Sequence, residues 1–259
     1  MQGSSAWPVV ERDCLDHEVL EALLDNEVAA VRVPDFVSAD VCAEAVAAIE
    51  AHGFGFYQNV EPRIGRIGIT QYEHRVAREE YFQKARVANE ARAQLFSTTA
   101  DPVMLVIDAL EEGWGSPVEL ATEPNGRSYF AGVIRIIGQA LIHCDWAPFD
   151  APGWAIGSIS SQLTWNIYYT LTDSGGETTI YNRPWTNDFE AFANIEDYGY
   201  NPMAVDGFEC QVIAPNQGEL LLFNPRNAHC VSPALGAGHR ITASSFVGRM
   251  PSDRLVLWS

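Results

Sequence analysis

The sequence predicts a mainly β protein with a helical N-terminal half. Up to about residue 125, apolar residues recur with helical spacing, whereas from Gly126 the chain changes to short runs rich in β-branched and aromatic residues. Turn sequences such as "SGGE", "PNQGE" and "ALGAGH" separate these runs. Short strands at such spacing favour an antiparallel barrel or sandwich.

Helices account for most of the first half. The first, in "DCLDHEVLEALLDNEV", has one apolar stripe made of Leu15, Val19, Leu20, Leu23 and Leu24. The second, in "SADVCAEAVAAIEAHG", has Ser38 as its expected N-cap and Gly53 as its stop, and "AAVRVPDFV" before it alternates like a short strand. Further helices are predicted in "VAREEYFQKARVANEARAQLF" and, after an Asp-Pro start, in "DPVMLVIDALEEGWG", which closes at Gly113 or Gly115.

The second half supplies the strands, in "RSYFAGVIRIIG", "QLTWNIYYTLTD", "TTIYNRP", "FECQVIAP", "ELLLFNP" and "RITASSFVGRM". The "DSGGETTIY" stretch predicts a hairpin turn in which Gly175 and Gly176 take positive φ. No repeat, low-complexity tract or compositional break marks a linker. We therefore expect one domain over 1–259, with 1–125 as mostly helical support and 126–259 as the β core.

Composition and charge narrow the class of protein. The formal charge of −18 makes the surface repel nucleic-acid phosphates and anionic lipid headgroups, so neither nucleic acid nor a membrane is an expected partner. The opening "MQGSSAWPVVERD" lacks signal-peptide features and no apolar run approaches the ~20 residues of a membrane span, which predicts a cytoplasmic location. The five cysteines are scattered without a CxxC pair, so they suggest neither a disulfide framework nor a cysteine zinc site. Nothing in the sequence predicts the oligomeric state.

A candidate metal site begins in "GQALIHCD". If this is a strand end, alternation sends His143 and Asp145 out of one face and Cys144 out of the other. An imidazole and a carboxylate on one face provide two ligands of a metal ion. His229, expected in a loop after the apolar strand of "GELLLFNPRNA", is the candidate third ligand, because a rolled sheet would bring it beside the first two.

Two histidines and one carboxylate on one face of an iron(II) ion leave three coordination positions open, enough for a chelating cosubstrate and dioxygen. A cation is then needed for the far end of the cosubstrate. Arg240 opens the strand "RITASS", in which Thr242 points the same way. A guanidinium binds a carboxylate through two parallel hydrogen bonds, to which the hydroxyl adds a third.

The chain resembles the iron(II)/2-oxoglutarate-dependent oxygenases, in the branch that includes prolyl-4-hydroxylase-type enzymes. In chain order, the resemblance lies in "VIRIIGQALIHCD", "GGETTIY", "GELLLFNPRNAHCVSP" and "HRITASSF". The chain is most similar to the carrier-independent halogenases of hapalindole-type alkaloid biosynthesis, over about residues 100–259. The resemblance implies a double-stranded β-helix (jelly roll, cupin-like) braced by α-helices. It also implies iron(II) held by His143, Asp145 and His229, and 2-oxoglutarate held by Arg240 and Thr242.

One departure from those halogenases changes the expected reaction. In them a small residue replaces the acidic ligand and halide fills the vacated position, whereas here Asp145 is present. The resemblance therefore implies that the enzyme hydroxylates, or otherwise oxidises, an unactivated C–H of a small specialised metabolite such as an alkaloid, a nucleoside or an amino-acid derivative. Dioxygen and 2-oxoglutarate would become succinate and carbon dioxide.

Other residues have weaker links to function. In "LTWNIYY", Asn166 and Tyr168 point one way and Trp165 the other, and all three are candidate substrate contacts as well as candidate packing residues. Arg135 lies within an apolar strand and needs a partner, and a structural ion pair is favoured over a substrate contact. The insertion "RPWTNDFEAFANIEDYGYNP" is either a lid or a surface excursion.

Two other functions remain open at this point. One is a metal-dependent cupin-type isomerase or lyase, which would leave Arg240 no cosubstrate to bind. The other is a catalytically silent small-molecule-binding protein on the same fold. The intact metal ligands and Arg240 argue against this second alternative. Desaturation, epimerisation and cyclisation use the same ligands and are not separated from hydroxylation by sequence.

Overall fold

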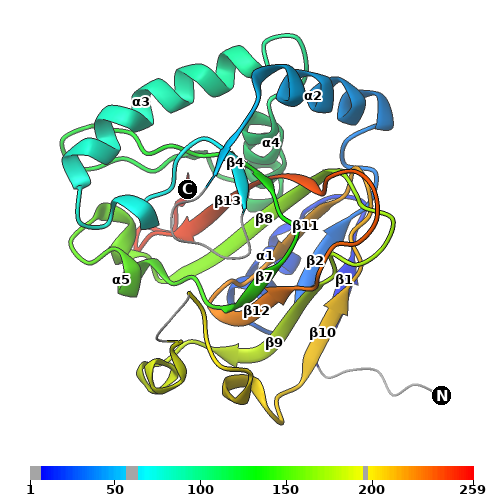
Figure 1. Ribbon diagram of the computed structural model, residues 1–259. Helices are drawn as coiled ribbons and strands as arrows, with labels where there is room; N and C mark the ends of the chain where they lie inside the picture. The colour runs from blue at the N-terminus through cyan, green and yellow to red at the C-terminus, as the bar shows by residue number, and fades with distance from the viewer. Residues whose placement is uncertain (1–6, 57–63, 195–197) are drawn as a thin grey trace.

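The computed structural model describes residues 7–56, 64–194 and 198–259, and in it helices cover one side of a rolled β structure (Figure 1). The helices are α1 (His17–Leu24), α2 (Ala39–His52), α3 (Arg78–Leu95), α4 (Pro102–Trp114) and the short α5 (Ala147–Asp150). The 3-10 helices are η1 (Tyr72–His74), η2 (Ala155–Ser158), η3 (Asn187–Phe192) and η4 (Pro202–Val205).

The strands form two sheets. The larger sheet has the order β1-β2-β11-β8-β13-β6-β4-β3, with β14 on β13 and β5 on β14. Its strands are β1 (Val9–Glu11), β2 (Ala30–Val33), β3 (Gly55–Phe56), β4 (Gly65–Ile67), β5 (Val118–Leu120), β6 (Val133–Ile136), β8 (Ser161–Thr170), β11 (Leu220–Phe223), β13 (Ile241–Arg249) and β14 (Leu255–Trp258). The smaller sheet, in the order β10-β9-β12-β7, contains β7 (Ala140–His143), β9 (Thr178–Pro184), β10 (Cys210–Ile213) and β12 (Asn227–Val231).

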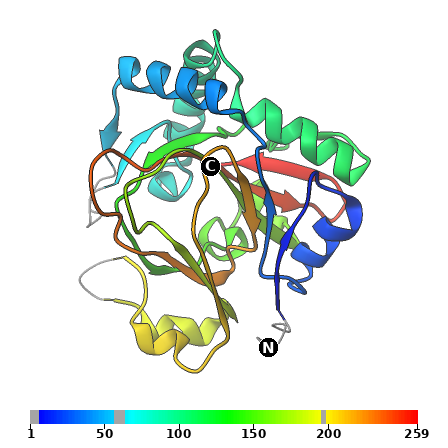
Figure 2. The same cartoon turned by 90° about the vertical axis from the view of Figure 1, so that its right-hand side faces the viewer.

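The path of the chain between the sheets is that of a double-stranded β-helix. From β6 onward the chain enters the larger sheet with β6, β8, β11 and β13 and the smaller sheet with β7, β9, β10 and β12. The resulting roll is seen in Figure 2, with helices outside the larger sheet. The predicted fold class, mainly β with helical support in the first half, is confirmed.

The two faces of the larger sheet have different partners. Its outer face packs against the helices in one core cluster, in which Trp165, Ile167 and Ala243 meet Leu20 and Val106. Its inner face meets the smaller sheet, and this inter-sheet cluster includes Tyr168, Leu221, Phe223, Ile180 and Ile213. The shared outer cluster supports our proposal that helices and sheets form one domain. No helix in the described ranges is long and apolar enough to cross a membrane.

Local signals set most helix ends as expected. Ser38 caps α2 by accepting a hydrogen bond from the Val41 amide, and Gly53 follows its last residue. The last long helix ends at Gly115 rather than Gly113, because Gly115 adopts the left-handed conformation at φ 75°.

Two local predictions were wrong. Gly175 and Gly176 have the predicted positive φ of 75°, but the turn is not a hairpin, because it carries the chain from β8 in one sheet to β9 in the other. His229 does not lie in a loop. It lies within β12, which pairs with both β7 and β9.

Candidate active site

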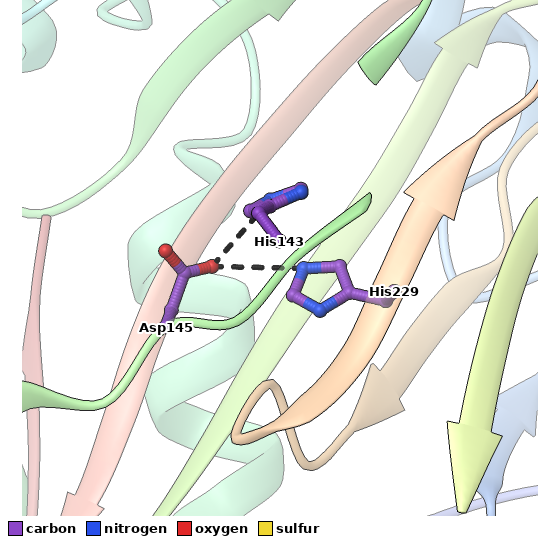
Figure 3. Close-up of side chains that lie close together, drawn as sticks. All are labelled: His143, Asp145 and His229. Carbon is purple, nitrogen blue, oxygen red and sulfur yellow. Dashed lines mark ion pairs between the residues drawn. The ribbon is translucent and has the colours of Figure 1, made fainter. Parts of the chain in front are cut away.

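Three predicted ligand residues meet where β7 lies beside β12 (Figure 3). His143 ends β7 and is directly opposite His229 in the antiparallel pair, while Asp145 follows two residues later. The Asp145 Oδ2 atom lies 3.8 Å from His143 Nε2 and 3.6 Å from His229 Nε2. Two ligand atoms on one ion, each at about 2.0–2.2 Å, are no more than about 4.4 Å apart, so these spacings suit a shared metal ion.

Hydrogen bonds orient both imidazoles toward that point. The Nδ1 atom of His143 is 2.7 Å from the Leu141 carbonyl, and that of His229 is 2.9 Å from the Asn227 carbonyl. Because a carbonyl only accepts, Nδ1 carries the proton in each ring and Nε2 keeps its lone pair. A metal-binding histidine is typically held in this way by its second nitrogen.

Burial and charge favour a neutral His229. Burial, then the adjacent His143 and Arg135, hold the pKa of His229 well below its usual range. A neutral imidazole is the form that binds metal. The site is nonetheless reachable, because the side chains of His143 and Asp145 are 25% and 33% exposed. The donor set and its accessibility fit iron(II) with open coordination positions.

A second group of residues fits an anion. Arg240 is 4% exposed and lies over the ring of Tyr168, 4.9 Å from its centroid. Its Nε and Nη1 atoms, and the Thr242 hydroxyl, are buried with no hydrogen-bond partner among the described residues. Burying unpaired donors is costly, so a carboxylate that accepts from both side chains would satisfy this site.

The register of β8 distributes the remaining candidates. Asn166 and Tyr168 face the barrel interior, since they pair with Ser244 and Thr242 of β13 and Tyr168 packs in the inter-sheet cluster. Trp165 packs on the outer face against the helices and is therefore no longer a candidate substrate contact.

The guanidinium of Arg135 donates a hydrogen bond to the Ser244 hydroxyl. Cys144 packs on the outside of the smaller sheet, away from the candidate ligands, as strand alternation predicted.

Tyr198 was not among the residues predicted to contribute to the site. It lies in the insertion after β9, and its ring is 6.0 Å from that of His143, edge to face. The Tyr198 hydroxyl accepts a hydrogen bond from the Leu141 amide, and the Tyr200 amide donates to the Ile142 carbonyl. Gly199 between them has φ 90°, and a Cβ there would lie 2.5 Å from the same carbonyl. The insertion is thus docked on β7 next to the candidate ligands, although residues 195–197 of it lie outside the described ranges.

Comparisons with known proteins identify the family of the chain. The family model described as carrier-protein-independent halogenase WelO5 matches residues 10–259. Leucinostatins biosynthesis cluster protein S from Purpureocillium lilacinum is 39% identical over 216 residues, which cover 78% of this chain and 88% of that protein. The L-gamma-glutamyl-L-propargylglycine hydroxylase of Streptantibioticus cattleyicolor is 28% identical over 265 residues, covering 98% of this chain and 97% of that protein.

Among solved structures, an N-substituted L-amino acid dioxygenase from Burkholderia ambifaria, in complex with alpha-KG, superimposes with a TM-score of 0.66. Its sequence identity is 16%, and the alignment covers 94% of this chain and 91% of that chain, so this likeness concerns the fold. The family match spans nearly all of the chain, and the protein therefore belongs to the carrier-protein-independent halogenase WelO5 family within the iron(II)/2-oxoglutarate-dependent oxygenases, as an enzyme that uses iron(II), 2-oxoglutarate and dioxygen.

Proposed function

We propose that this enzyme hydroxylates an unactivated C–H bond of a small specialised metabolite, with an amino-acid derivative as the favoured substrate class. The observation that carries the proposal is the convergence of His143 Nε2, His229 Nε2 and the Asp145 carboxylate, with both Nδ1 atoms already hydrogen-bonded. These three residues would hold iron(II). The amino-acid class is supported by the relative named as a hydroxylase of a γ-glutamyl amino acid.

The 2-oxoglutarate site would be formed by Arg240 and Thr242. The two partnerless guanidinium nitrogens and the Thr242 hydroxyl would donate to the far carboxylate of the cosubstrate. The ring of Tyr168 holds the guanidinium in place from one side. When bound, iron(II) and 2-oxoglutarate supply the oxidising chemistry, and the chain's contribution is to fix the ligands and orient the substrate.

Hydroxylation is favoured over halogenation because Asp145 is retained. Its carboxylate occupies the position that a halide needs, and its distances to both imidazoles suit a ligand rather than a bystander. The Asp145 amide donates to the Pro225 carbonyl at 2.9 Å, which ties the residue to the loop before β12 and fixes its approach to the site.

An anaerobic titration tests the two halves of the site separately. Iron(II) and 2-oxoglutarate added to the metal-free protein should produce the weak visible charge-transfer band of the chelate, and the band should need both components. In Arg240→Ala the band should require much more 2-oxoglutarate. Bound iron without any band in the wild type would contradict the oxygenase assignment and favour the isomerase or lyase alternative.

Turnover provides the second test. His143→Ala and Asp145→Ala should each abolish substrate-dependent succinate formation, because each removes an iron ligand. Unchanged turnover in both variants would refute the ligand assignment.

A further inference from the structure

Three asparagine side chains connect the helical half of the protein to the strand that carries His229. The Asn227 Nδ2 atom donates a hydrogen bond to Asn26 Oδ1 at 2.5 Å, and Asn26 Nδ2 donates to Asn182 Oδ1 at 3.1 Å. Asn26 follows α1, whereas Asn182 lies in β9 and Asn227 begins β12. The hydrogen bonds therefore hold the end of α1 against two strands of the smaller sheet.

Asn227 is the member of this chain that reaches His229. It is fully buried, and its backbone carbonyl lies 2.9 Å from His229 Nδ1. The Nε2 atom of the same ring faces Asp145 (Figure 3). The residue opposite Asn227 on β9 is Pro184, which has no N–H to donate to that carbonyl. The position of the Asn227 carbonyl therefore sets the direction of a candidate metal ligand.

Strand pairing around His229 is irregular on both sides. The register of β12 with β9 shifts between Asn227 and His229, and its register with β7 shifts between His229 and Val231. Such irregularities disrupt the ladder of backbone hydrogen bonds and change the direction of side chains. Other contacts must then fix the backbone at Asn227, and the hydrogen bond to Asn26 is one of them.

Asn26 has a backbone conformation that is more usual for glycine. Its φ is 62°, its amide donates to the Leu23 carbonyl, and the following amide of Glu27 donates to the Ala22 carbonyl. These two bonds form the Schellman motif that ends many helices, in which glycine is the usual residue and asparagine is less common. The helix end alone would thus favour glycine. Asparagine adds the carboxamide that joins the other two asparagines.

We propose that Asn26 is a positioning residue of the metal site: through the side chain of Asn227 it holds the carbonyl that orients His229, and so raises the affinity for iron(II). This inference rests on the proposed function, because it needs His229 to be an iron ligand. Replacing a residue that holds a metal ligand typically weakens metal binding by roughly 10- to 100-fold. Asn26 acts from one residue further away, so we expect a loss of about 10-fold in Asn26→Gly.

The test measures metal binding and stability in the same variant. Asn26→Gly removes the carboxamide but suits the left-handed backbone, so its urea midpoint without metal should stay close to that of the wild type. Equilibrium dialysis against iron(II) without oxygen should show the weaker binding. Cobalt(II) bound in place of iron should show altered ligand-field bands, because these depend on ligand geometry. A merely structural role would lower stability and leave both metal readouts unchanged.

Two variants isolate the hydrogen bond to Asn227. Asp35→Gly is the matched control, because Asp35 is an exposed non-glycine residue with φ 51°, and it should leave both metal readouts unchanged. Asn26→Asp keeps an oxygen that accepts from Asn227 and tolerates the left-handed backbone, but it cannot donate to Asn182. We therefore expect Asn26→Asp to bind iron(II) much more tightly than Asn26→Gly.

Asn227→Leu tests the same hydrogen bond if Asn26→Gly does not fold. Leucine has a similar volume, and Asn227 Oδ1 is buried without a hydrogen-bond partner among the described residues. Iron(II) binding should weaken as in Asn26→Gly. The proposal is overturned if these variants bind iron(II) like the wild type, or if Asn26→Asp binds as weakly as Asn26→Gly. Failure of the proposed function differs, because His229→Ala would then bind iron(II) as tightly as the wild type.

Discussion

Replacing Arg240 by methionine should stabilise the ligand-free protein while removing its affinity for 2-oxoglutarate. The guanidinium is almost fully buried, and burial lowers its pKa. Two of its nitrogens have no hydrogen-bond partner among the described residues, and each such buried donor costs about 1–3 kcal/mol. Against this, the substitution forfeits the contact with the Tyr168 ring, which contributes about 1–2 kcal/mol.

At central values the two unpaired donors cost about 4 kcal/mol, while the substitution forfeits about 1.5 kcal/mol from the ring contact and about 1.5 kcal/mol from the hydrogen bond to Tyr168. Because methionine fills most of the same space, the net gain in the free energy of unfolding is about 1 kcal/mol for Arg240→Met. For a chain of this size that gain raises the melting temperature by about 2 °C. The wild type, by contrast, should gain stability from 2-oxoglutarate, by about 2.7 kcal/mol at a free concentration 100 times its dissociation constant.

Thermal melts with and without manganese(II) and 2-oxoglutarate measure both effects. Arg254→Met, at an exposed ion pair, is the control and should change the melting temperature little in either condition. The reasoning is refuted if Arg240→Met is clearly less stable than the wild type without ligand, or if 2-oxoglutarate stabilises both proteins equally.

Three further predictions concern pH, backbone and metal. Burial, and then the charge of Asp145, raises the pKa of Asp150 to about 7. Because an unfolded aspartate ionises near pH 4, metal-free protein should lose stability as pH rises from about 4 to 7. Asp150→Asn should be about 1–2 kcal/mol more stable than the wild type at pH 8 and equally stable near pH 4. If urea melts show the stabilities of the two proteins changing in parallel with pH, the prediction is wrong. Gly175→Ala should lower the free energy of unfolding by about 3 kcal/mol or more, and Gly153→Ala by about 1 kcal/mol. Both glycines have positive φ, but only at Gly175 would a Cβ meet a carbonyl oxygen, that of Pro233 at 1.9 Å. Equal losses of stability in urea melts would contradict the clash. His143→Ala should weaken iron(II) binding at least 10-fold in equilibrium dialysis, and an unchanged constant would exclude it as a ligand.

The strand periodicity predicted the site better than it predicted the connections. Alternation predicted His143 and Asp145 together and Cys144 apart, and the structure has this arrangement although β7 ends at His143. It also separated Asn166 and Tyr168 from Trp165. The partner of each strand is a long-range choice, so the sequence did not reveal that the "SGGE" turn connects two sheets or that His229 lies within a strand.

The role of the insertion could not be predicted for the same reason. Tyr198 reaches Leu141 across 57 residues of chain, and nothing in its local sequence marks that contact. Arg135 was expected to have a structural ion pair, since a charge in an apolar strand needs a partner. The face of the sheet on which Arg135 lies could not be predicted, because it depends on the pairing of β6 with β13.

The docking of the insertion on β7 also has a consequence for how the protein behaves at high concentration. β7 is the last strand of the smaller sheet, and an open strand edge invites pairing with another molecule. The Tyr198 hydroxyl and the Tyr200 amide occupy backbone groups of Leu141 and Ile142 that would otherwise offer such a template. Shortening the insertion to a tight loop should therefore promote aggregation through β7, even where the barrel itself still folds.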